Sequence, residues 1–165
     1  MKAAEERENA AQWMRQAVAA AHGARERGEV PVGACIVLGE TILAVAGNRA
    51  ITLQDPSAHA EIVALREAAR KIANYRLTNA VVYSTFEPCV MCAGALIQAR
   101  VKRLVYGVRN SRRGAIESRF NVCNYDFLNH RIEVTAGVLE NECREIMCEF
   151  YRAPRCGTAG AKLEG

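Results

Sequence analysis

Ala80-Val-Val-Tyr-Ser-Thr-Phe86, followed by Glu87-Pro88-Cys89-Val90-Met91-Cys92, is the stretch of the chain that decides the fold. The first seven residues form a mostly apolar and β-branched run, which is typical of a strand buried on both faces. Glu87-Pro88 then turns the chain into a helix that runs to about Arg100, and proline suits this position because the first amide protons of a helix need no partner. The sequence predicts a strand–turn–helix unit with two thiols at the start of its helix.

The rest of the chain continues this alternation of strands and helices. Apolar residues recur at helical spacing in three further segments, marked by Ala10, Trp13, Met14, Ala17, Val18 and Ala21; by Ile62, Leu65, Ala69 and Ile72; and by Cys143, Ile146, Met147, Phe150 and Tyr151. Apolar runs predict strands at residues 30–38, 41–46, 104–108 and 132–135, the first two joined as a hairpin across Gly39-Glu40. A long loop covers residues 109–131. This order predicts an α/β fold whose sheet is mostly parallel after the hairpin.

The helix expected over residues 57–74 begins with Ser57, a residue type that caps helix N-termini. This start places His59 and Glu61 in the first turn. Side chains two residues apart point to different sides of a regular helix, so both face one site only if the end of the helix points at it. We therefore expect two helix N-termini, at His59 and at Cys89, to converge at the open end of the sheet, where α/β folds usually bind ligands.

His59, Cys89 and Cys92 are a ligand set typical of zinc. The two cysteines are three residues apart, so they share one face of a helix, and a helix N-terminus favours the thiolate that zinc binds. One imidazole and two thiolates leave the fourth position of a tetrahedral ion to water, as in catalytic zinc sites. The sequence predicts one Zn²⁺ ion per chain. Three unrelated core residues, or a redox pair of cysteines, are the less favoured interpretations.

Glu61 completes this set without having to bind the metal. Zinc lowers the pKa of bound water to about 7, and a carboxylate beside it can take the proton, pass it to a ring nitrogen and later protonate a departing amine. A His-x-Glu followed by Pro-Cys-x-x-Cys is the signature of zinc deaminases that act on nucleobases. We expect hydrolytic loss of ammonia from an aromatic amidine-like carbon, with Glu61 as the catalytic residue.

The composition indicates one ordinary globular domain. The chain has 165 residues, 50% of them hydrophobic and 24% charged, which is enough to bury a core. We expect a single domain over residues 1–155 and a disordered tail over residues 156–165. No apolar run approaches the roughly eighteen residues of a membrane span, and the charged segment 2–8 lacks the apolar core of a signal peptide. Seven cysteines, an odd number, then predict reduced thiols in a cytoplasmic protein.

Basic residues are concentrated just downstream of the metal motif. Between residues 100 and 119 a single acid, Glu117, accompanies seven basic residues: Arg100, Lys102, Arg103, Arg109, Arg112, Arg113 and Arg119. Such a run is usually a solvated face, but beside a nucleobase site it would attract the phosphates on either side of the target. The sequence therefore predicts single-stranded nucleic acid as the partner.

Six stretches are distinctive: Val30-Pro31-Val32-Gly33-Ala34, Asn48-Arg49, residues 55–62 (DPSAHAEI), Asn74-Tyr75-Arg76-Leu77, residues 87–95 (EPCVMCAGA) and Asn129-His130-Arg131. Together they resemble the TadA family of bacterial tRNA adenosine deaminases, and the resemblance runs from Trp13 to Arg152. The resemblance implies a cytidine-deaminase-like three-layer α/β/α sandwich, with a five-stranded mixed sheet flanked by helices. It also implies a homodimer that converts the wobble adenosine of a tRNA anticodon loop to inosine. Asn48 would hydrogen-bond the flipped purine, or else simply serve the Gly47-Asn48 turn.

Eleven positions depart together from that family's usual residues. Asn110 replaces an aspartate, Val108 an alanine, Phe86 a leucine, Tyr125 a histidine and Tyr151 a phenylalanine; the others are Leu53, Ser111, Arg113, Asn124, Cys148 and Pro154. The set resembles laboratory-evolved adenine base-editor deaminases, which act on deoxyadenosine in single-stranded DNA. An amide at position 110 depends less than a carboxylate on a ribose 2′-hydroxyl and does not repel phosphate. The substrate contacts expected on this basis are Val32, Asn48, Phe86, Val108, Asn110, Arg112 and Tyr151.

Other functions fit parts of the same pattern. A natural tRNA deaminase would carry the eleven positions as ordinary variation, and a cytosine or guanine deaminase would share the zinc ligands. A zinc-stabilised RNA-binding module without turnover would have no use for Glu61. For Tyr151, packing into the core is as well supported as contact with the substrate, because it lies on the apolar stripe of the last helix.

Overall fold

The structure, a computed structural model, describes residues 2–152. The elements in chain order are α1 (Lys2–Glu26), β1 (Gly33–Leu38), β2 (Thr41–Gly47), α2 (Ala60–Ile72), β3 (Val81–Phe86), α3 (Val90–Gln98), β4 (Arg103–Val108), the 3-10 helix η1 (Val122–Asn124), β5 (Glu133–Ala136) and α4 (Glu140–Arg152). Within these residues no helix combines the length and the apolar character needed to span a membrane.

The five strands form one mixed sheet in the order β2-β1-β3-β4-β5. β1 is antiparallel to both β2 and β3, whereas β3, β4 and β5 run parallel to one another. The hairpin turn is Gly39-Glu40, and Gly39 has a φ of 62°, a left-handed conformation that glycine adopts without steric cost. The predicted five-stranded mixed sheet, parallel after its hairpin, is confirmed.

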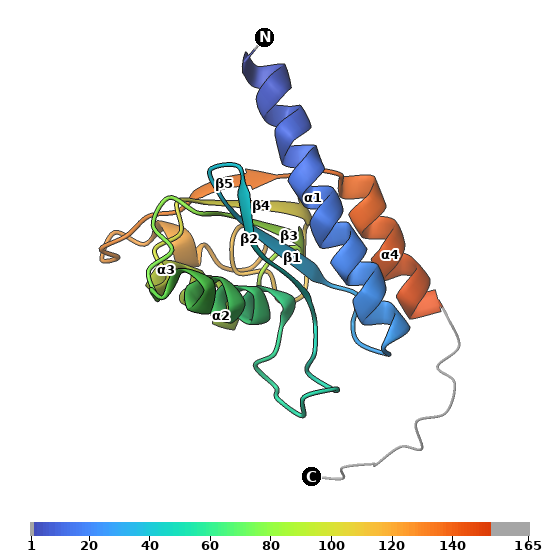
Figure 1. The fold of residues 1–165 in the computed structure, drawn as a ribbon. Coiled ribbons are helices and arrows are strands. Elements are labelled where there is room, and N and C mark those ends of the chain that lie inside the picture. The colour runs from blue at the N-terminus through green and yellow to red at the C-terminus, as the bar shows by residue number, and fades with distance from the viewer. Residues whose placement is uncertain (1, 153–165) are drawn as a thin grey trace.

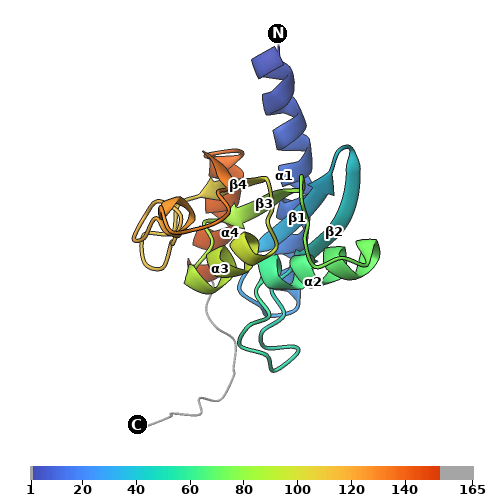
Figure 2. The same ribbon diagram turned by 90° about the vertical axis from the view of Figure 1, so that its left-hand side faces the viewer.

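Helices cover both faces of the sheet (Figure 1), so the predicted three-layer sandwich is also confirmed. α1 and α4 contact each other on one face, and α2 and α3 contact each other on the opposite face. The alternation of strand side chains follows these layers: Cys35 and Val37 pack with Met14 of α1, while Ala34 and Ile36 belong to the larger core under α2 and α3. α1 extends past the sheet at its N-terminal end (Figure 2).

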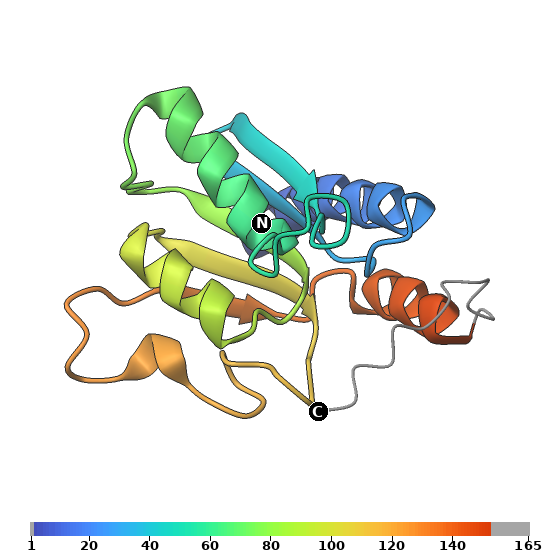
Figure 3. The same cartoon turned by 90° about the horizontal axis from the view of Figure 1, so that it is seen from below.

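Several predicted boundaries were wrong. β1 begins at Gly33, not at residue 30, and α2 begins at Ala60. Ser57 does not cap α2: its hydroxyl donates to Asp55 Oδ1 over 2.6 Å, because the Asp55 carboxylate organises the preceding turn. The loop after β4 contains η1, which lies beside α3 (Figure 3).

The cysteines within the described residues are free thiols, as expected: Cys35, Cys89, Cys92, Cys123, Cys143 and Cys148. Cys156 and the predicted tail, residues 156–165, lie outside the described residues.

Candidate active site

Two helix N-termini meet at one point, as the motif spacing predicted. His59 is the N-cap residue of α2 and Cys89 that of α3, and both have extended backbone conformations. Cys92 lies in the first turn of α3 and is fully buried. The positive ends of two helix dipoles therefore point at the same small volume, which favours anionic ligands there.

The distances between the three donor atoms fit a tetrahedral zinc ion. His59 Nδ1 lies 3.6 Å from Cys89 Sγ and 3.5 Å from Cys92 Sγ, and the two sulfur atoms are 3.7 Å apart. Bonds of about 2.3 Å to sulfur and about 2.0 Å to nitrogen, at tetrahedral angles, place such donors about 3.5–3.8 Å from one another. His59, Cys89 and Cys92 can therefore hold one zinc ion without rearrangement.

The protonation of the two cysteines in the metal-free protein bears on how they would bind a metal. Hydrogen bonding with Cys92 and with His59 lowers the pKa of Cys89 to about 3, which favours its thiolate form. Cys92 keeps its proton in the metal-free protein, because the same hydrogen bond and burial raise its pKa. Thiolates are the form that zinc binds, and binding would release the remaining proton.

Glu61 lies against this cluster in the first turn of α2. It is buried, with Oε2 3.5 Å from Cys92 Sγ and Oε1 3.1 Å from Ser84 Oγ. Burial raises the pKa of the Glu61 carboxyl, which suits a group that must both accept and return a proton near neutral pH. Ser84, on β3, was not predicted as a functional residue. The available signal was a pair of small hydroxyl residues, Ser84 and Thr85, in a buried strand.

Asn48 follows β2 and caps α2, although it lies twelve residues before the helix begins in the sequence. Its Oδ1 accepts the Ala60 N–H over 2.8 Å, so it satisfies a helix amide that Ser57 was expected to serve. The side chain also lines the cleft described next. With its oxygen bound to Ala60, Asn48 offers a ligand its amide N–H₂ group, which can donate but not accept.

A cleft of about 770 Å³ opens above Glu61 and the ligand cluster, at the carboxyl ends of the parallel strands β3 and β4. Its lining includes His59, Cys89 and Glu61. It also includes all seven predicted substrate contacts: Val32, Asn48, Phe86, Val108, Asn110, Arg112 and Tyr151. Tyr151 does not pack into the core, because this side chain is 63% exposed.

Only some of the basic residues between residues 100 and 119 lie at the cleft. Arg109, Arg112 and Arg113 line the cleft, whereas Arg103 pairs with Glu133 on the neighbouring strand, 2.9 Å away. Two further arginines that the sequence did not indicate, Arg144 and Arg152 of α4, line the same cleft. They are 35 or more residues away from Arg109 in the sequence, so no local pattern could have grouped them.

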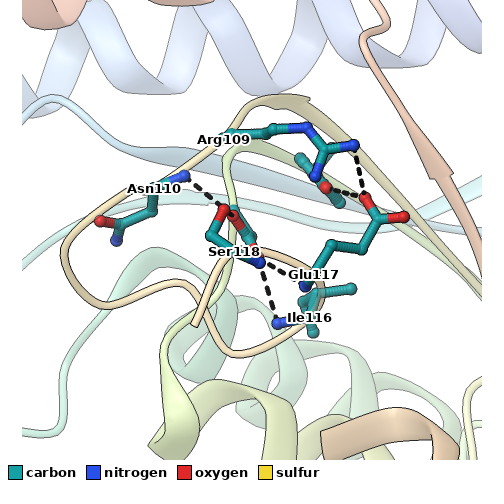
Figure 4. Close-up of polar contacts among 7 residues, drawn as sticks. Arg109, Asn110, Ile116, Glu117 and Ser118 are labelled. Atoms are coloured by element: carbon teal, nitrogen blue, oxygen red, sulfur yellow. Dashed lines mark hydrogen bonds and ion pairs between the residues drawn. The ribbon is translucent and has the colours of Figure 1, made fainter. Parts of the chain in front are cut away.

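Glu87 is a second residue that the sequence left without a role. It is 1% exposed, and its carboxylate accepts backbone N–H bonds from Asn110 (2.9 Å), Ile116 (3.2 Å), Glu117 (2.7 Å) and Ser118 (2.9 Å), and a bond from the Ser118 hydroxyl. Figure 4 shows these bonds, together with the Arg109–Glu117 ion pair. Burial alone would raise the pKa of Glu87, but the hydrogen bonds outweigh it and hold the pKa below its ordinary value. The only available signal was an acid at the end of a buried strand.

This fold, with a buried glutamate beside a His-Cys-Cys cluster, defines a deaminase of the cytidine-deaminase-like class. The MafB19-like deaminase family matches residues 8–155. The tRNA-specific adenosine deaminase of Haemophilus influenzae is 46% identical over 143 residues, 86% of this chain and 83% of that protein. The chain belongs to the MafB19-like deaminase family, and its curated relatives there include tRNA-specific adenosine deaminases.

Solved structures agree with this assignment. A structure from a study of A-to-I editing by tRNA:A34 deaminases at the wobble position of transfer RNA superposes with a TM-score of 0.80 at 41% identity. The match covers 82% of this chain and 98% of that one. A guanine deaminase of Nitrosomonas europaea has a TM-score of 0.72 at 23% identity, covering 87% and 85% of the two chains, which shows a shared fold.

Proposed function

We propose that this protein removes the exocyclic amine of adenine in single-stranded nucleic acid, with one Zn²⁺ ion held by His59, Cys89 and Cys92. The observation that carries the proposal is the placement of Glu61, buried against the three ligands at the floor of a cleft whose walls carry five arginines. A binding module would not need a buried carboxylate of raised pKa at that point.

The chemistry is the addition of water to C6 of the purine followed by loss of ammonia. Zinc, when bound, lowers the pKa of water and so supplies the nucleophile at neutral pH. Glu61 accepts one proton from the attacking water on a carboxylate oxygen and delivers it to N1 as the C6–O bond forms. Glu61 then takes the proton of the new C6 hydroxyl and delivers it to the amine as the C6–N6 bond breaks, so that ammonia leaves and a C6 carbonyl, hypoxanthine, remains. The Ser84 hydroxyl lies 3.1 Å from Oε1 of Glu61 and 2.8 Å from the Phe86 carbonyl oxygen, and the Asn48 amide can donate to an acceptor of the purine.

The walls of the cleft favour a nucleic acid over a free base. Arg109, Arg112, Arg113, Arg144 and Arg152 come from two parts of the chain, the segment after β4 and the helix α4. They suit the phosphates that flank an extruded nucleotide. Tyr151, exposed beside them, offers a ring on which a neighbouring base can stack.

We propose that the substrates include single-stranded DNA, in addition to the tRNA that the names of the relatives indicate. Seven of the eleven positions that depart from the family pattern line the cleft: Phe86, Val108, Asn110, Ser111, Arg113, Cys148 and Tyr151. Leu53, Asn124 and Tyr125 do not line it, and Pro154 lies outside the described residues. Changes concentrated around the substrate favour an altered substrate over scattered variation. An evolved adenine base-editor type of deaminase, acting on deoxyadenosine, has this pattern.

A panel of oligonucleotides tests the proposal directly. Wild-type protein, loaded with zinc, is incubated with single-stranded DNA and with an RNA anticodon hairpin, each carrying either one adenine or one cytosine target, and the products are weighed by mass spectrometry. Conversion of adenine in both backbones supports the proposal, and conversion in RNA alone reduces it to a tRNA deaminase. Conversion of cytosine alone, or of no base by protein that holds one zinc ion per chain, refutes it.

We propose a homodimer as the working form, in a cytoplasmic location. A hollow between α2 and α3 is lined mainly by apolar side chains, among them Ile62, Leu65, Met91 and the 68% exposed Tyr75, with Ser57, Arg66 and Gln98 as its polar members. Such a surface suits contact with a second copy. Light scattering at several protein concentrations measures the mass in solution, and a monomer at all of them rejects this part of the proposal.

A further inference from the structure

The segment 110–118 forms one wall of the cleft but has neither a helix nor a strand to fix its shape. It carries Arg112 and Arg113, which line the cleft. The internal bonds of the segment are few: Gly114 N–H donates to Asn110 O over 2.8 Å, and Asn110 Oδ1 accepts from the amides of Arg112 and Arg113. A segment of this kind needs an anchor elsewhere to hold one conformation.

Glu87 provides most of the hydrogen bonds of that anchor, beside the Ala115 N–H bond to Pro88 O over 2.9 Å and the burial of Ala115 and Ile116 in the core. Its carboxylate accepts N–H bonds at both ends of the segment, from Asn110 at the beginning and from Ile116, Glu117 and Ser118 at the end. The chain therefore wraps around a single buried side chain. Donors in the middle of a loop are usually satisfied by water, whereas here four amides share two carboxylate oxygens, and bonds to a charged acceptor are the stronger kind.

Gly114 shows how closely the segment packs on this carboxylate. A Cβ atom at position 114 would lie 2.3 Å from Glu87 Oε2 and 2.6 Å from the Asn110 carbonyl oxygen, both far shorter than a normal contact. The segment 110–118 therefore packs directly against the Glu87 carboxylate at Gly114, in addition to its hydrogen bonds with that carboxylate. Either residue can be changed to disturb the same contact.

We propose that Glu87 is a positioning residue for nucleic-acid binding: it fixes the 110–118 segment so that Arg112 and Arg113 face the cleft. The inference rests on the proposed function, since it assigns those arginines to phosphates. Glu87 has no hydrogen bond to His59, Glu61, Cys89 or Cys92 within the described residues. Glu61 is held independently, by Ser84 of β3. Loss of Glu87 should therefore weaken binding and leave the chemical step intact.

Glu87→Gln is the test, in the full-length zinc-loaded protein. Glutamine keeps the length of the side chain but replaces one acceptor oxygen by an NH₂ group, which must face N–H donors whichever way the amide is turned. With two phosphate contacts displaced, we expect KM for a single-stranded oligonucleotide to rise about tenfold, and the slope of log KM against log salt to fall by roughly 1.4. The turnover number should stay within about threefold of wild type. One zinc ion per chain should be retained.

Glu29→Gln is the matched control. Glu29 is equally buried and its carboxylate accepts N–H bonds from Ile51 and Thr52, but those two residues do not line the cleft. This variant should lose thermal stability without changing KM or the salt slope. Ser118→Ala, which removes one bond to Glu87, should give a smaller rise in KM and keeps the test open if Glu87→Gln fails to fold.

Three results would overturn the inference: an unchanged KM and salt slope in Glu87→Gln and Ser118→Ala, an equal change in Glu29→Gln, or loss of zinc from Glu87→Gln. Binding of a fluorescent oligonucleotide by anisotropy is measured in parallel. If wild-type protein binds but deaminates no substrate, the proposed function fails while the anisotropy series still decides the role of Glu87.

Discussion

Asn110→Asp changes the charge of the cleft without removing a contact. Asn110 Oδ1 accepts the backbone N–H groups of Arg112 and Arg113 over 3.2 and 3.0 Å, and a carboxylate accepts both bonds equally well. The backbone N–H of residue 110 still donates to Glu87 Oε2. We therefore expect the segment to keep its shape, and the variant to differ from wild type by one negative charge beside the substrate.

The size of the effect follows from Coulomb's law. A carboxylate about 7 Å from a phosphate is repelled by roughly 1–2.5 kcal/mol at an effective dielectric constant of about 20–40, and physiological salt removes about half of this. Repulsion of the two phosphates flanking the target then reduces transition-state stabilisation by about 1–2 kcal/mol in total, which is a five- to thirtyfold fall in kcat/KM on DNA. In RNA a ribose 2′-hydroxyl can donate to the new carboxylate, and a hydrogen bond to a charged group, worth about 1.5–3 kcal/mol, offsets the repulsion.

The assay compares kcat/KM on single-stranded DNA and on an RNA anticodon hairpin of the same sequence. Asn124→Asp serves as the control, because Asn124 is exposed and does not line the cleft but the substitution alters the net charge by the same amount. Asn110→Asp should lower activity on DNA and spare the hairpin, while Asn124→Asp changes neither. Equal activity of Asn110→Asp and wild type on DNA would refute the reasoning.

Four further predictions follow from the same contacts. Glu61→Ala should lower kcat by about 10²- to 10⁴-fold with zinc retained, as measured by metal analysis; an active variant would remove Glu61 from the mechanism. Ser84→Ala, which deprives the Glu61 carboxylate of its bond over 3.1 Å, should lower kcat by about tenfold or more at unchanged KM. Arg112→Ala should reduce the salt slope of oligonucleotide binding by roughly 0.7, and a parallel line would show that Arg112 makes no phosphate contact. Burial alone would raise the pKa of Glu29, but the hydrogen bonds from Thr52 and Ile51 outweigh burial and lower the pKa below its ordinary value. The stability that this shift contributes to the folded protein is present above the unfolded-state pKa of about 4.3, and it is lost as the pH falls through the folded-state pKa. The free energy of unfolding, measured by denaturation between pH 7 and 3, should therefore fall less steeply with decreasing pH for Glu29→Gln than for wild type.

Local patterns in the sequence determined most of the fold and the chemical core of the site. The apolar run at residues 80–86 and the helical spacing of Met14, Ala17 and Ala21 specify which faces are buried, because burial repeats with the period of the backbone. One helical turn is enough to bring the sulfur atoms of Cys89 and Cys92 within 3.7 Å of each other, as a pair of candidate ligands requires. The error at Ser57 also has a local cause. Its hydroxyl could either cap α2 or bond to the preceding turn, and it donates to Asp55 in that turn.

Only the tertiary structure decided what surrounds that core. Asn48 caps a helix that begins twelve residues later, Glu87 holds a segment some 23–31 residues away, and Arg144 and Arg152 reach the cleft from the other face of the sheet. Such contacts join residues that no periodicity relates, and they form only when the strands have paired and the helices have packed. The sequence by itself named a deaminating centre. The cleft wall that carries Arg112 and Arg113 depends on a buried carboxylate, Glu87, which accepts the amides of a loop that has no regular structure of its own.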